Sequence, residues 1–420
     1  MQLVLMVRDG GVSGLLDVGG IELVRRAVRA AKLAGATRCL LVGAGAEVLA
    51  RRFAGDVVLG DACELEAVAT LEEASARVEG RFLVGEGSWL WTLGAAKQLA
   101  GLPSGRAAGL YTGSGALFAA ALEPMHWSAL VEAGGDVAGS VGAIDGLMRV
   151  EAADLNLMEV RDAASAREAK ARMIRTLRKP FGRNADGLTA YYLNRPISMS
   201  VSRLLIHTPI TPNQVTFLNL ILALVGAGMI AMATPLWVAL GAVVIQLVSI
   251  FDGIDGEIAR MKLMMSARGE LYDTIGDDVN RGTFFLALGW ACYQQTPHVG
   301  FAAGTLLGMA MLIPAWFVLY AEMARKGVSS LNNAEWGFER EGGRISGSLR
   351  KFLVGFSYLL KRDSYILIFV LFMLIGQPQV SFALMLLGIS FVFGGVVAER
   401  WATWQDARAA GAGERQIGAM

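Results

Sequence analysis

The sequence predicts a multidomain protein with an α/β domain at the N-terminus, followed by an all-α domain of six transmembrane helices. Hydrophobic residues make up 54% of the 420 residues, and the mean hydropathy is +0.47. This is too apolar for an ordinary soluble protein. The excess is uneven, because charges occur throughout residues 1–185 whereas long apolar runs begin near residue 212. The two halves of the chain therefore belong to different fold classes.

Strand-like and helical patterns alternate through the N-terminal part. Gln2–Val7 has the composition of a buried strand, and Ile21–Leu33 has apolar residues at helical spacing. Arg38–Val42 is a second predicted strand, and the alternation continues through Phe82–Val84. Such alternation is typical of an α/β fold with a mostly parallel sheet. We assign residues 1–165 to this domain, and we expect it to lie in the cytosol.

Residues 166–210 form a predicted linker between the domains. The segment Arg167–Arg183 carries seven cations, which suits either a solvated helix face or a juxtamembrane segment facing anionic headgroups. Its position just before the apolar half favours the second interpretation. Tyr191–His207 is expected to form an amphipathic helix at the membrane interface. Its lipid-facing residues would be Ile197, Val201, Leu204 and Leu205, and its polar face would carry Arg195 and Arg203.

Six apolar segments follow within a predicted domain of residues 211–405, which precedes a C-terminal tail of residues 406–420. Five of them approach the roughly 20 residues that a helix needs to cross a bilayer, and the fifth in order is short unless it starts as early as Leu360. The predicted spans are Thr216–Met232, Leu236–Ile254, Leu271–Cys292, Phe301–Tyr320, Tyr365–Ile375 and Phe382–Val397.

The loop charges predict the orientation of these spans. The connections Ala233–Pro235, Tyr293–His298 and Gly376–Val380 contain no Lys or Arg, whereas the opposite connections contain nine such residues between Arg260 and Lys351. The positive-inside rule then places both termini and the connection between the second and third spans on the cytosolic side. We expect the protein to be integral to the cell (inner) membrane. The apolar segment Met1–Met6 is too short for a signal peptide.

Composition excludes several other classes. A formal net charge of +1 argues against nucleic-acid binding as a main task. The three cysteines lack metal-ligand spacing and indicate neither a zinc site nor a disulfide framework, and the three histidines form no cluster.

Four aspartates at the cytosolic edge of the second and third spans are the strongest functional signal. Asp252 and Asp255 are three residues apart, and Asp273 and Asp277 are four apart, so a helical hairpin would point both pairs into one cavity. Four neighbouring carboxylates cannot all remain ionised without cations. Hard oxygen ligands favour Mg²⁺, Mn²⁺ or Ca²⁺.

Residues around the aspartates extend this interpretation to phosphate chemistry. Gly253, Gly256 and Gly269 leave room for a ligand to approach the backbone, and Arg260 is placed to meet a phosphate. Carboxylates, a divalent metal and an arginine are the components of phosphoryl transfer. Helix-end charges facing water would explain one or two of the aspartates, but not four at helical spacing.

The string from Asp252 to Asp277 resembles the signature of the CDP-alcohol phosphotransferase family, D-x2-D-G-x2-A-R-x8-G-x3-D-x3-D, at each of its eight fixed positions. The six predicted spans and the preceding interfacial helix are also similar to that family. The segment Thr211–Thr216, just before the first span, resembles its usual entry motif.

The resemblance implies a mechanism and a set of site residues. Asp252, Asp255 and Asp273 would hold Mg²⁺ or Mn²⁺ against the pyrophosphate of a CDP-alcohol. Two ions would be bound, and Ca²⁺ would either inhibit or substitute for them. Asp277 would also bind metal and act as the base on the acceptor hydroxyl. CMP would leave, and the protein would be a homodimer. The implied nucleotide-binding residues are Asp252, Gly256, Ala259, Arg260 and Gly269, with Asn213 and Thr216 either touching the nucleotide or capping the first span. Lys262, Arg268 and Arg203 would suit a phosphorylated acceptor.

The N-terminal segment Gly14–Val24 resembles the stretch after the phosphate loop of sugar-phosphate nucleotidyltransferases, which have a Rossmann-like fold. Such a domain precedes the membrane enzyme in bifunctional inositol-phosphate cytidylyltransferase/di-myo-inositol-phosphate-phosphate synthases. The departures are as informative as the match. The expected glycine-rich loop is Arg8-Asp9-Gly10-Gly11-Val12, Ser13 replaces a lysine, and Glu86 and Arg161 replace two metal-binding aspartates. We therefore expect a degenerate domain without nucleotidyl transfer, which scaffolds, dimerises or still binds a ligand.

The sequence thus favours transfer of a phosphoalcohol group from a CDP-inositol-like donor to an acceptor such as an inositol phosphate. A CDP-diacylglycerol-dependent phosphatidyltransferase of phospholipid synthesis remains the main alternative. A cation-coupled transporter should carry carboxylates near mid-membrane and often inverted repeats, neither of which is found. A pure scaffold would leave the aspartates unexplained.

Overall fold

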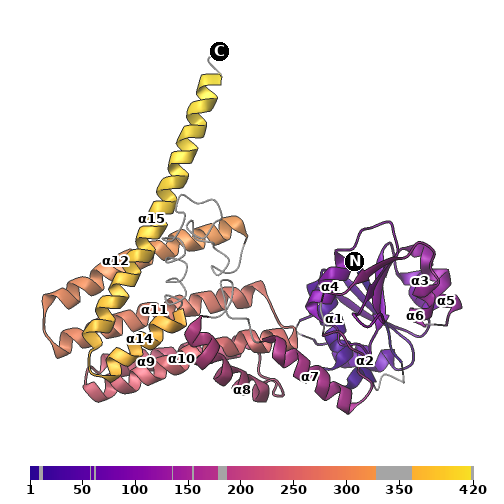
Figure 1. The fold of residues 1–420 in the computed structure, drawn as a ribbon, viewed down its shortest axis with the longest axis horizontal. Coiled ribbons are helices and arrows are strands. Elements are labelled where there is room, and N and C mark those ends of the chain that lie inside the picture. The colour runs from indigo at the N-terminus through magenta and orange to yellow at the C-terminus, as the bar shows by residue number, and fades with distance from the viewer. Residues whose placement is uncertain are drawn as a thin grey trace. The chain divides into compact units, whose positions relative to one another are not determined.

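The computed structural model describes residues 1–8, 13–56, 58–60, 63–134, 136–153, 156–177, 187–327 and 362–417. Their contacts divide the chain into two compact units (Figure 1). The first comprises Met1–Arg178 together with two short later segments, Leu204–Pro209 and Ala259–Met264. The second comprises Lys179–Arg203, Ile210–Ile258 and Met265–Met420.

A seven-stranded sheet forms the centre of the first unit, in the order β3-β2-β1-β4-β6-β5-β7. The pairs β1/β2, β2/β3, β1/β4 and β5/β7 are parallel, whereas β6 runs antiparallel to β4 and β5. The predicted α/β class is therefore confirmed. The strands are β1 (Gln2–Met6), β2 (Arg38–Val42), β3 (Glu64–Val68), β4 (Phe82–Glu86), β5 (Ala108–Tyr111), β6 (Leu117–Leu122) and β7 (Met148–Glu151).

Helices of the first unit cover the sheet (Figure 1). Two of them begin with a threonine whose side chain accepts a hydrogen bond from the first turn, Thr70 from Glu73 N and Thr92 from Ala95 N. The helices are η2 (Ser13–Leu15), α1 (Leu23–Leu33), α2 (Ala46–Phe53), α3 (Leu71–Arg77), α4 (Leu93–Ala100), η4 (Pro124–His126), α5 (Trp127–Glu132), α6 (Val137–Gly142) and α7 (Ala163–Leu177). The Arg178–Arg183 end of the predicted basic segment lies outside the described residues.

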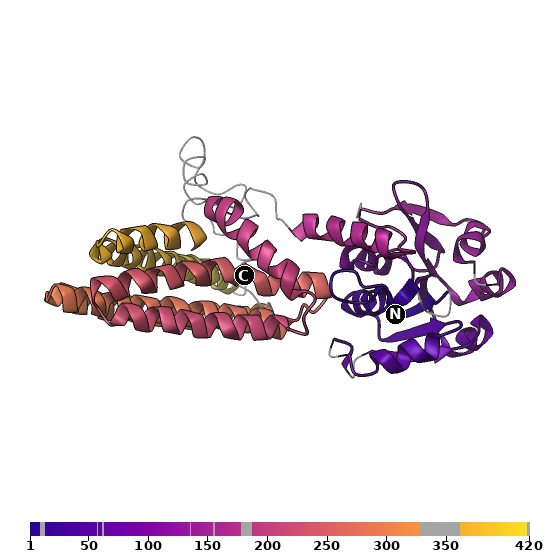
Figure 2. The ribbon, with the colours of Figure 1, turned by 90° about the horizontal axis from the view of Figure 1, so that it is seen from below.

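The elements of the second unit in the described part of the chain are all helices, and its long helices run side by side (Figure 2). The first of them starts with a reciprocal cap between Thr211 and Gln214, with Pro212 at its first position. The elements are η5 (Ala190–Asn194, a π-helical turn), α8 (Arg195–Leu205), α9 (Pro212–Ala231), α10 (Pro235–Lys262), α11 (Ala267–Gln295), α12 (Val299–Lys326), α14 (Arg362–Leu374) and α15 (Pro378–Ile417).

Each of the six predicted spans coincides with one of these helices, although Met232 and Ile375 lie one residue beyond the ends of α9 and α14. Four helices, α9, α10, α12 and α15, are long and apolar enough to cross a membrane. Helix α11 contains many charges in its first half, and the described part of α14 has 13 residues. The structure therefore supports a membrane-embedded helical region with four candidate spans, and a count of six is a proposal.

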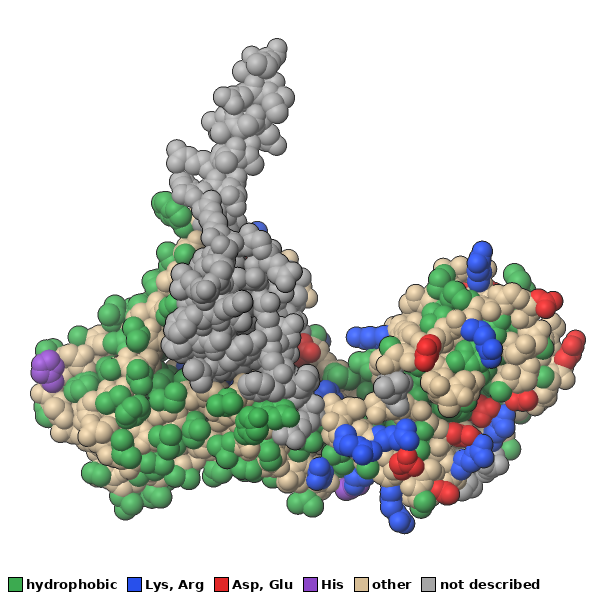
Figure 3. All heavy atoms as spheres, viewed as in Figure 1, with side chains coloured by type: hydrophobic (Ala, Val, Ile, Leu, Met, Phe, Trp, Pro, Cys, Tyr) green, Lys and Arg blue, Asp and Glu red, His purple; other side chains and the backbone are tan. Residues whose placement is uncertain are grey.

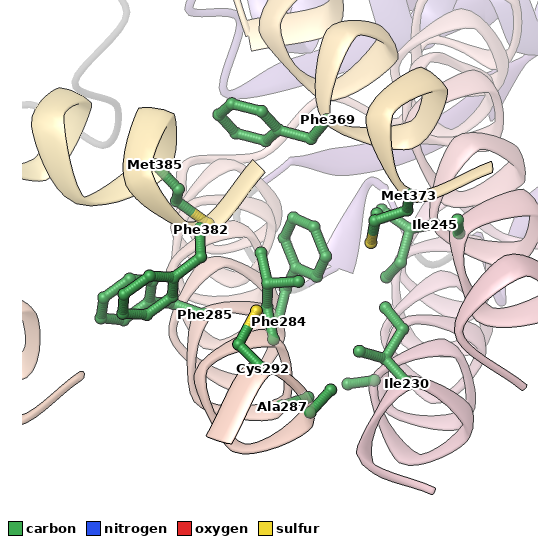
Figure 4. Packing of buried hydrophobic residues seen from close by; sticks show 14 of the residues in the cluster. Ile230, Ile245, Phe284, Phe285, Ala287, Cys292, Phe369, Met373, Phe382 and Met385 are labelled. Carbon is green, nitrogen blue, oxygen red and sulfur yellow. The ribbon is translucent and has the colours of Figure 1, made fainter. Parts of the chain in front are cut away.

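Aromatic and aliphatic side chains from α9, α10, α11, α12, α14 and α15 form the core of the helical unit, and Figure 4 shows part of it. Phe285 of α11 stacks on Phe382 of α15 with ring centroids 5.4 Å apart. Hydrophobic side chains also spread over the outside of this unit (Figure 3). Leu218, Leu306 and Phe317, for example, are more than half exposed. Such a surface fits a lipid environment, because apolar side chains outside a bundle lose nothing in hydrocarbon.

Candidate active site

The four predicted aspartates line one pocket of the helical unit. Its walls come from α9, α10 and α11. Asp252, Asp273 and Asp277 each offer a carboxylate oxygen, and these oxygens all lie within 4.8 Å of one another. All three residues are half-buried. The helical spacing thus does bring carboxylates from two helices together.

Asp255 is held by a neighbouring hydroxyl. The Thr216 Oγ1 of α9 donates a hydrogen bond to Asp255 Oδ2 at 2.5 Å, and the Gly256 amide donates to Asp255 Oδ1 at 2.6 Å. A carboxylate that accepts two such bonds is fixed in orientation. Thr216 is therefore placed to position Asp255. Its location at the start of the first predicted span did not indicate this hydrogen bond.

Arg362, at the start of α14, supplies a cation to the cluster. Its guanidinium donates hydrogen bonds to both Asp252 and Asp277. This residue could not be recognised from the sequence, because 85 positions separate it from Asp277 and it belongs to no motif. Its position shows that the pocket holds positive charge against its carboxylates. Oxygen donors at this spacing also fit a divalent cation, which prefers such ligands.

Glu257 is fully buried and lies at the centre of a second polar cluster beside the aspartates. Its Oε1 accepts hydrogen bonds from Arg195 Nη1 at 2.9 Å and Ser198 Oγ at 2.8 Å, and its Oε2 accepts one from Ser202 Oγ at 2.7 Å. The three partners lie on α8, so the polar face of α8 packs on α10. Gly253 admits this contact, because a Cβ there would meet the Arg195 guanidinium.

Apolar side chains lie on the exposed side of α8, together with Arg203. Ile197 is 40% exposed and Leu204 is 74% exposed, whereas Ser198 and Ser202 are buried. Gly253 therefore accommodates a side chain of the protein, where we expected room for a ligand. Arg195, which we expected on a solvent-facing surface, is bound to Glu257.

A polar network joins η5 and α10 to the start of α14, next to Arg362. Asn194 Nδ2 donates to Ser249 Oγ at 3.2 Å and to Asp363 Oδ1 at 3.2 Å, and Ser249 Oγ donates to Asp363 at 3.1 Å. Gln246 Nε2 donates to Asn194 Oδ1 at 3.3 Å. These bonds hold the residue that follows Arg362 and so restrict where its guanidinium can lie.

Comparison with known families agrees with this geometry. Residues 209–396 match the model of the CDP-alcohol phosphatidyltransferase family. The chain contains a CDP-alcohol phosphatidyltransferase domain. The matched residues include all four aspartates and Arg362.

Curated relatives share sequence with the C-terminal part of the chain. The bifunctional IPC transferase and DIPP synthase of Thermococcus kodakarensis is 36% identical over 146 residues, which are 35% of this chain and 32% of the relative. The proteins of the same name from Rubrobacter xylanophilus and Aquifex aeolicus are 37% and 30% identical, over 31% and 37% of this chain and 27% and 34% of the relatives. The chain thus spans about a third of the length of the curated relatives it matches.

The remaining predicted nucleotide residues of the transferase domain occupy two places. A Cβ on Gly269 would meet Asn213 Oδ1 at 3.1 Å, so the start of α9 lies against the first turn of α11. Ala259 and Arg260 belong to the last turn of α10, and both are half-buried. Gly256 directly follows Asp255 and donates to it.

The three basic residues expected at an acceptor differ in their surroundings. Arg203 and Arg268 are exposed. Lys262 is 5% exposed, and its ammonium donates to the Thr208 carbonyl at 2.6 Å. Arg362 is the described cation that contacts the aspartates directly.

Asp278, the neighbour of Asp277, points to different partners. It is 5% exposed, accepts a hydrogen bond from Tyr320 at 2.8 Å and pairs with Arg281 at 2.5 Å. It does not line the pocket of the four aspartates. The two adjacent carboxylates therefore have separate environments.

In the first unit, the predicted degenerate site centres on Arg8 and Glu86, at the carboxyl ends of β1 and β4. The two side chains form an ion pair of 2.7 Å. Burial raises the pKa of Glu86 above its ordinary value, and the attraction of Arg8 partly offsets this. Arg161 pairs with Glu159 at 2.6 Å. The Asp9–Val12 part of the expected loop lies outside the described residues.

Proposed function

We propose that the helical unit transfers a phosphoalcohol group from a CDP-alcohol to the hydroxyl of an acceptor and releases CMP. The single observation that carries this proposal is the convergence of Asp252, Asp255, Asp273 and Asp277 on one pocket within the matched domain. The family generally depends on divalent metal ions. In this chain the four carboxylates would hold Mg²⁺ or Mn²⁺, which would neutralise the charge of the donor pyrophosphate.

Asp277 is the proposed general base. Its carboxylate would accept the proton of the acceptor hydroxyl while the acceptor oxygen bonds to the phosphorus that carries the alcohol. The bond from that phosphorus to the CMP oxygen breaks, and CMP leaves with the bonding electron pair. Asp277 then returns the proton to solvent. Arg362 would stabilise the anionic groups gathered at the pocket, because its guanidinium already contacts two of its carboxylates.

The donor is proposed to be CDP-inositol or a similar soluble CDP-alcohol, with an inositol phosphate as acceptor. The names of the curated relatives support this choice. The membrane arrangement is proposed to have six spans with the site at the cytosolic face. The exposed side chains of Ile197 and Leu204 on α8 support an interfacial position for that helix.

The first unit is proposed to have no nucleotidyltransferase activity. The support is chemical, since Ser13 stands where active enzymes carry a lysine and Arg161 stands where they carry a metal-binding aspartate, and a guanidinium there opposes a metal ion. Purified protein should release no pyrophosphate from CTP with sugar or polyol phosphates. Release of pyrophosphate with any of them would overturn this part of the proposal.

The function is tested by offering the purified full chain a panel of CDP-alcohols and acceptors with Mg²⁺ or Mn²⁺ and measuring CMP. Turnover should require the metal and fall at least about 10³-fold in Asp277→Asn, within the range of general-base losses. Metal-dependent binding of the CDP-alcohol should partly survive in that variant. Asp278→Asn, the matched control on the same helix, should keep most of the activity.

The panel also separates the alternatives. Turnover with CDP-diacylglycerol but with no soluble donor would support a phosphatidyltransferase of phospholipid synthesis. Full activity of Asp277→Asn would show that the base is another group. Absence of CMP release with every pair, together with cation flux in vesicles, would favour a transporter.

A further inference from the structure

The C-terminal end of α10, the helix that carries Asp252 and Asp255, is held by hydrogen bonds from other segments of the chain. Helix ends leave their last carbonyl groups without partners inside the helix. At this end the Met264 amide donates back to the Ala259 carbonyl at 2.9 Å, which closes a Schellman-type turn. Leu263, inside that turn, has a φ of +51° although it is not a glycine. Such a conformation costs on the order of 1–2 kcal/mol and persists only where neighbours enforce it.

Two buried arginines of α1 provide that enforcement within the first unit. Arg26, which is 0% exposed, donates through one nitrogen to the Met261 carbonyl at 2.5 Å and to the Val18 carbonyl at 2.8 Å. Arg29, which is 6% exposed, donates to the Lys262 carbonyl at 2.6 Å. The last two carbonyls of α10 therefore each accept a hydrogen bond from a guanidinium. A cation at this end of a helix also complements the helix dipole.

The arginines are themselves held in place. Arg29 makes a bidentate contact with Asp56, with Nη2–Oδ2 at 2.8 Å and Nε–Oδ1 at 3.1 Å, and the Asp56 side chain is fully buried. Its Nη1 is left to reach the end of α10. Burying a guanidinium costs free energy unless it is hydrogen-bonded. Both buried guanidinium groups direct hydrogen bonds to the same helix end.

The neighbouring segment Leu204–Pro209 completes the arrangement. Lys262 Nζ donates to the Thr208 carbonyl at 2.6 Å. Gly20 has a φ of +86°, and a Cβ there would collide with the Ile206 carbonyl oxygen. The loop before α1 therefore approaches this segment backbone to backbone, which only glycine allows.

We propose that the sheet domain, through Arg26 and Arg29, acts as a positioning cap for α10 and sets the placement of Asp252 and Asp255 needed for metal binding. Asp255 lies six residues, less than two helical turns, before Met261, so rotation or fraying of the last turn would shift both carboxylates. This inference rests on the proposed metal site. It also gives a degenerate domain a mechanical role in the transfer reaction.

Two measurements on the full chain in detergent micelles test the cap. Hydrogen exchange reports the order of α10 without any metal, and Mn²⁺ titration followed by electron paramagnetic resonance reports the metal site. Arg26→Met and Arg29→Met should speed exchange about tenfold or more at residues 259–264 and measurably at residues 252–258. Their apparent Mn²⁺ affinity should fall about 10-fold, as is common when groups behind metal ligands are removed.

Arg25→Met is the matched control. Arg25 lies on the same helix, its Nε is 3.5 Å from Asp56, and its guanidinium stacks over Phe53, but it makes no described hydrogen bond to α10. It should leave both readouts near wild type. Arg26→Lys and Arg29→Lys keep the charge without the planar fork, so they should restore part of both readouts, which a loss of the fold would not allow.

The outcomes separate this inference from the proposed function. Unchanged exchange at residues 252–264 in Arg26→Met and Arg29→Met, with the strands of the sheet still protected, would overturn the cap. Faster exchange confined to residues 259–264, with wild-type Mn²⁺ affinity, would overturn its positioning role. A wild-type protein that binds no Mn²⁺ would sink the proposed metal site, whereas exchange at residues 252–258 would still decide whether the arginines order the helix.

Discussion

Removing the charge of Glu257 should weaken the packing of α8 against α10 and lower the free energy of unfolding. Glu257 is fully buried and accepts hydrogen bonds from Arg195, Ser198 and Ser202. In Glu257→Ala the Arg195 guanidinium, whose side chain is only 14% exposed, would remain without its carboxylate. Breaking a buried ion pair in this way typically costs about 3–5 kcal/mol. Glu257→Gln keeps one acceptor oxygen, so it should cost roughly half as much, because its remaining hydrogen bonds are no longer charge-assisted.

The measurement is equilibrium unfolding in mixed detergent and SDS micelles, followed by tryptophan fluorescence. A double-mutant cycle of Arg195→Met and Glu257→Gln isolates the pair from the two serines. We expect a coupling energy of about 2 kcal/mol or more, and a double variant less destabilised than the sum of the single variants. Arg203→Met, on the exposed surface of the same helix, is the control and should cost below about 0.5 kcal/mol.

Single variants that each cost less than about 1 kcal/mol, with no coupling between them, would contradict a stabilising role for the Arg195–Glu257 pair. That result would mean that α8 is held by its apolar contacts, and that the buried carboxylate contributes nothing net. Retained stability with lost CMP release would instead assign Glu257 a role in the reaction.

Three further predictions concern single side chains. Arg362→Gln should raise the apparent Mn²⁺ affinity about tenfold, because it removes a cation that competes for Asp252 and Asp277. Arg268→Gln, a change at an exposed position, should alter the Mn²⁺ affinity little. Weaker Mn²⁺ binding in Arg362→Gln would contradict this. Thr216→Val should lower Mn²⁺ affinity about tenfold through loss of the hydroxyl that orients Asp255, and an unchanged titration would show that this bond is dispensable. For Glu86, burial raises the pKa, so the folded state holds the proton more tightly than the unfolded state and wild-type stability declines as pH rises from 4.5 through the raised value. The gain in unfolding temperature of Glu86→Gln over wild type should therefore be larger at pH 7 than at pH 4, since the Arg8 partner is half exposed and contributes little; a gain that shrinks with pH would contradict the assignment.

Local patterns were sufficient to predict much of this fold. Arg38–Val42 forms a strand with the predicted bounds, because a run of buried aliphatic residues between turns has few alternatives. The helices around the spans extend beyond their apolar cores, as in α10, which continues from Ile254 to Lys262. An apolar segment ends where the charged residues begin, whereas the backbone hydrogen bonds of the helix continue past that point.

The site was predictable where its residues lie on one or two helices. The periodicity of Asp252, Asp255, Asp273 and Asp277 defines a shared face, and the structure has them line one pocket. Arg362 and the Arg195–Glu257 pair escaped notice because their partners lie 62 to 110 positions away. Contacts between residues so far apart in the sequence depend on how the helices pack. The spacing of residues within a single segment does not indicate that packing.

The most direct test of the account is to locate Mn²⁺ in the protein by anomalous X-ray scattering. The account predicts manganese in the pocket between α10 and α11, within about 2.3 Å of carboxylate oxygens from both helices. Manganese bound elsewhere, with Asp252 and Asp277 still paired to Arg362 at saturating metal, would contradict it.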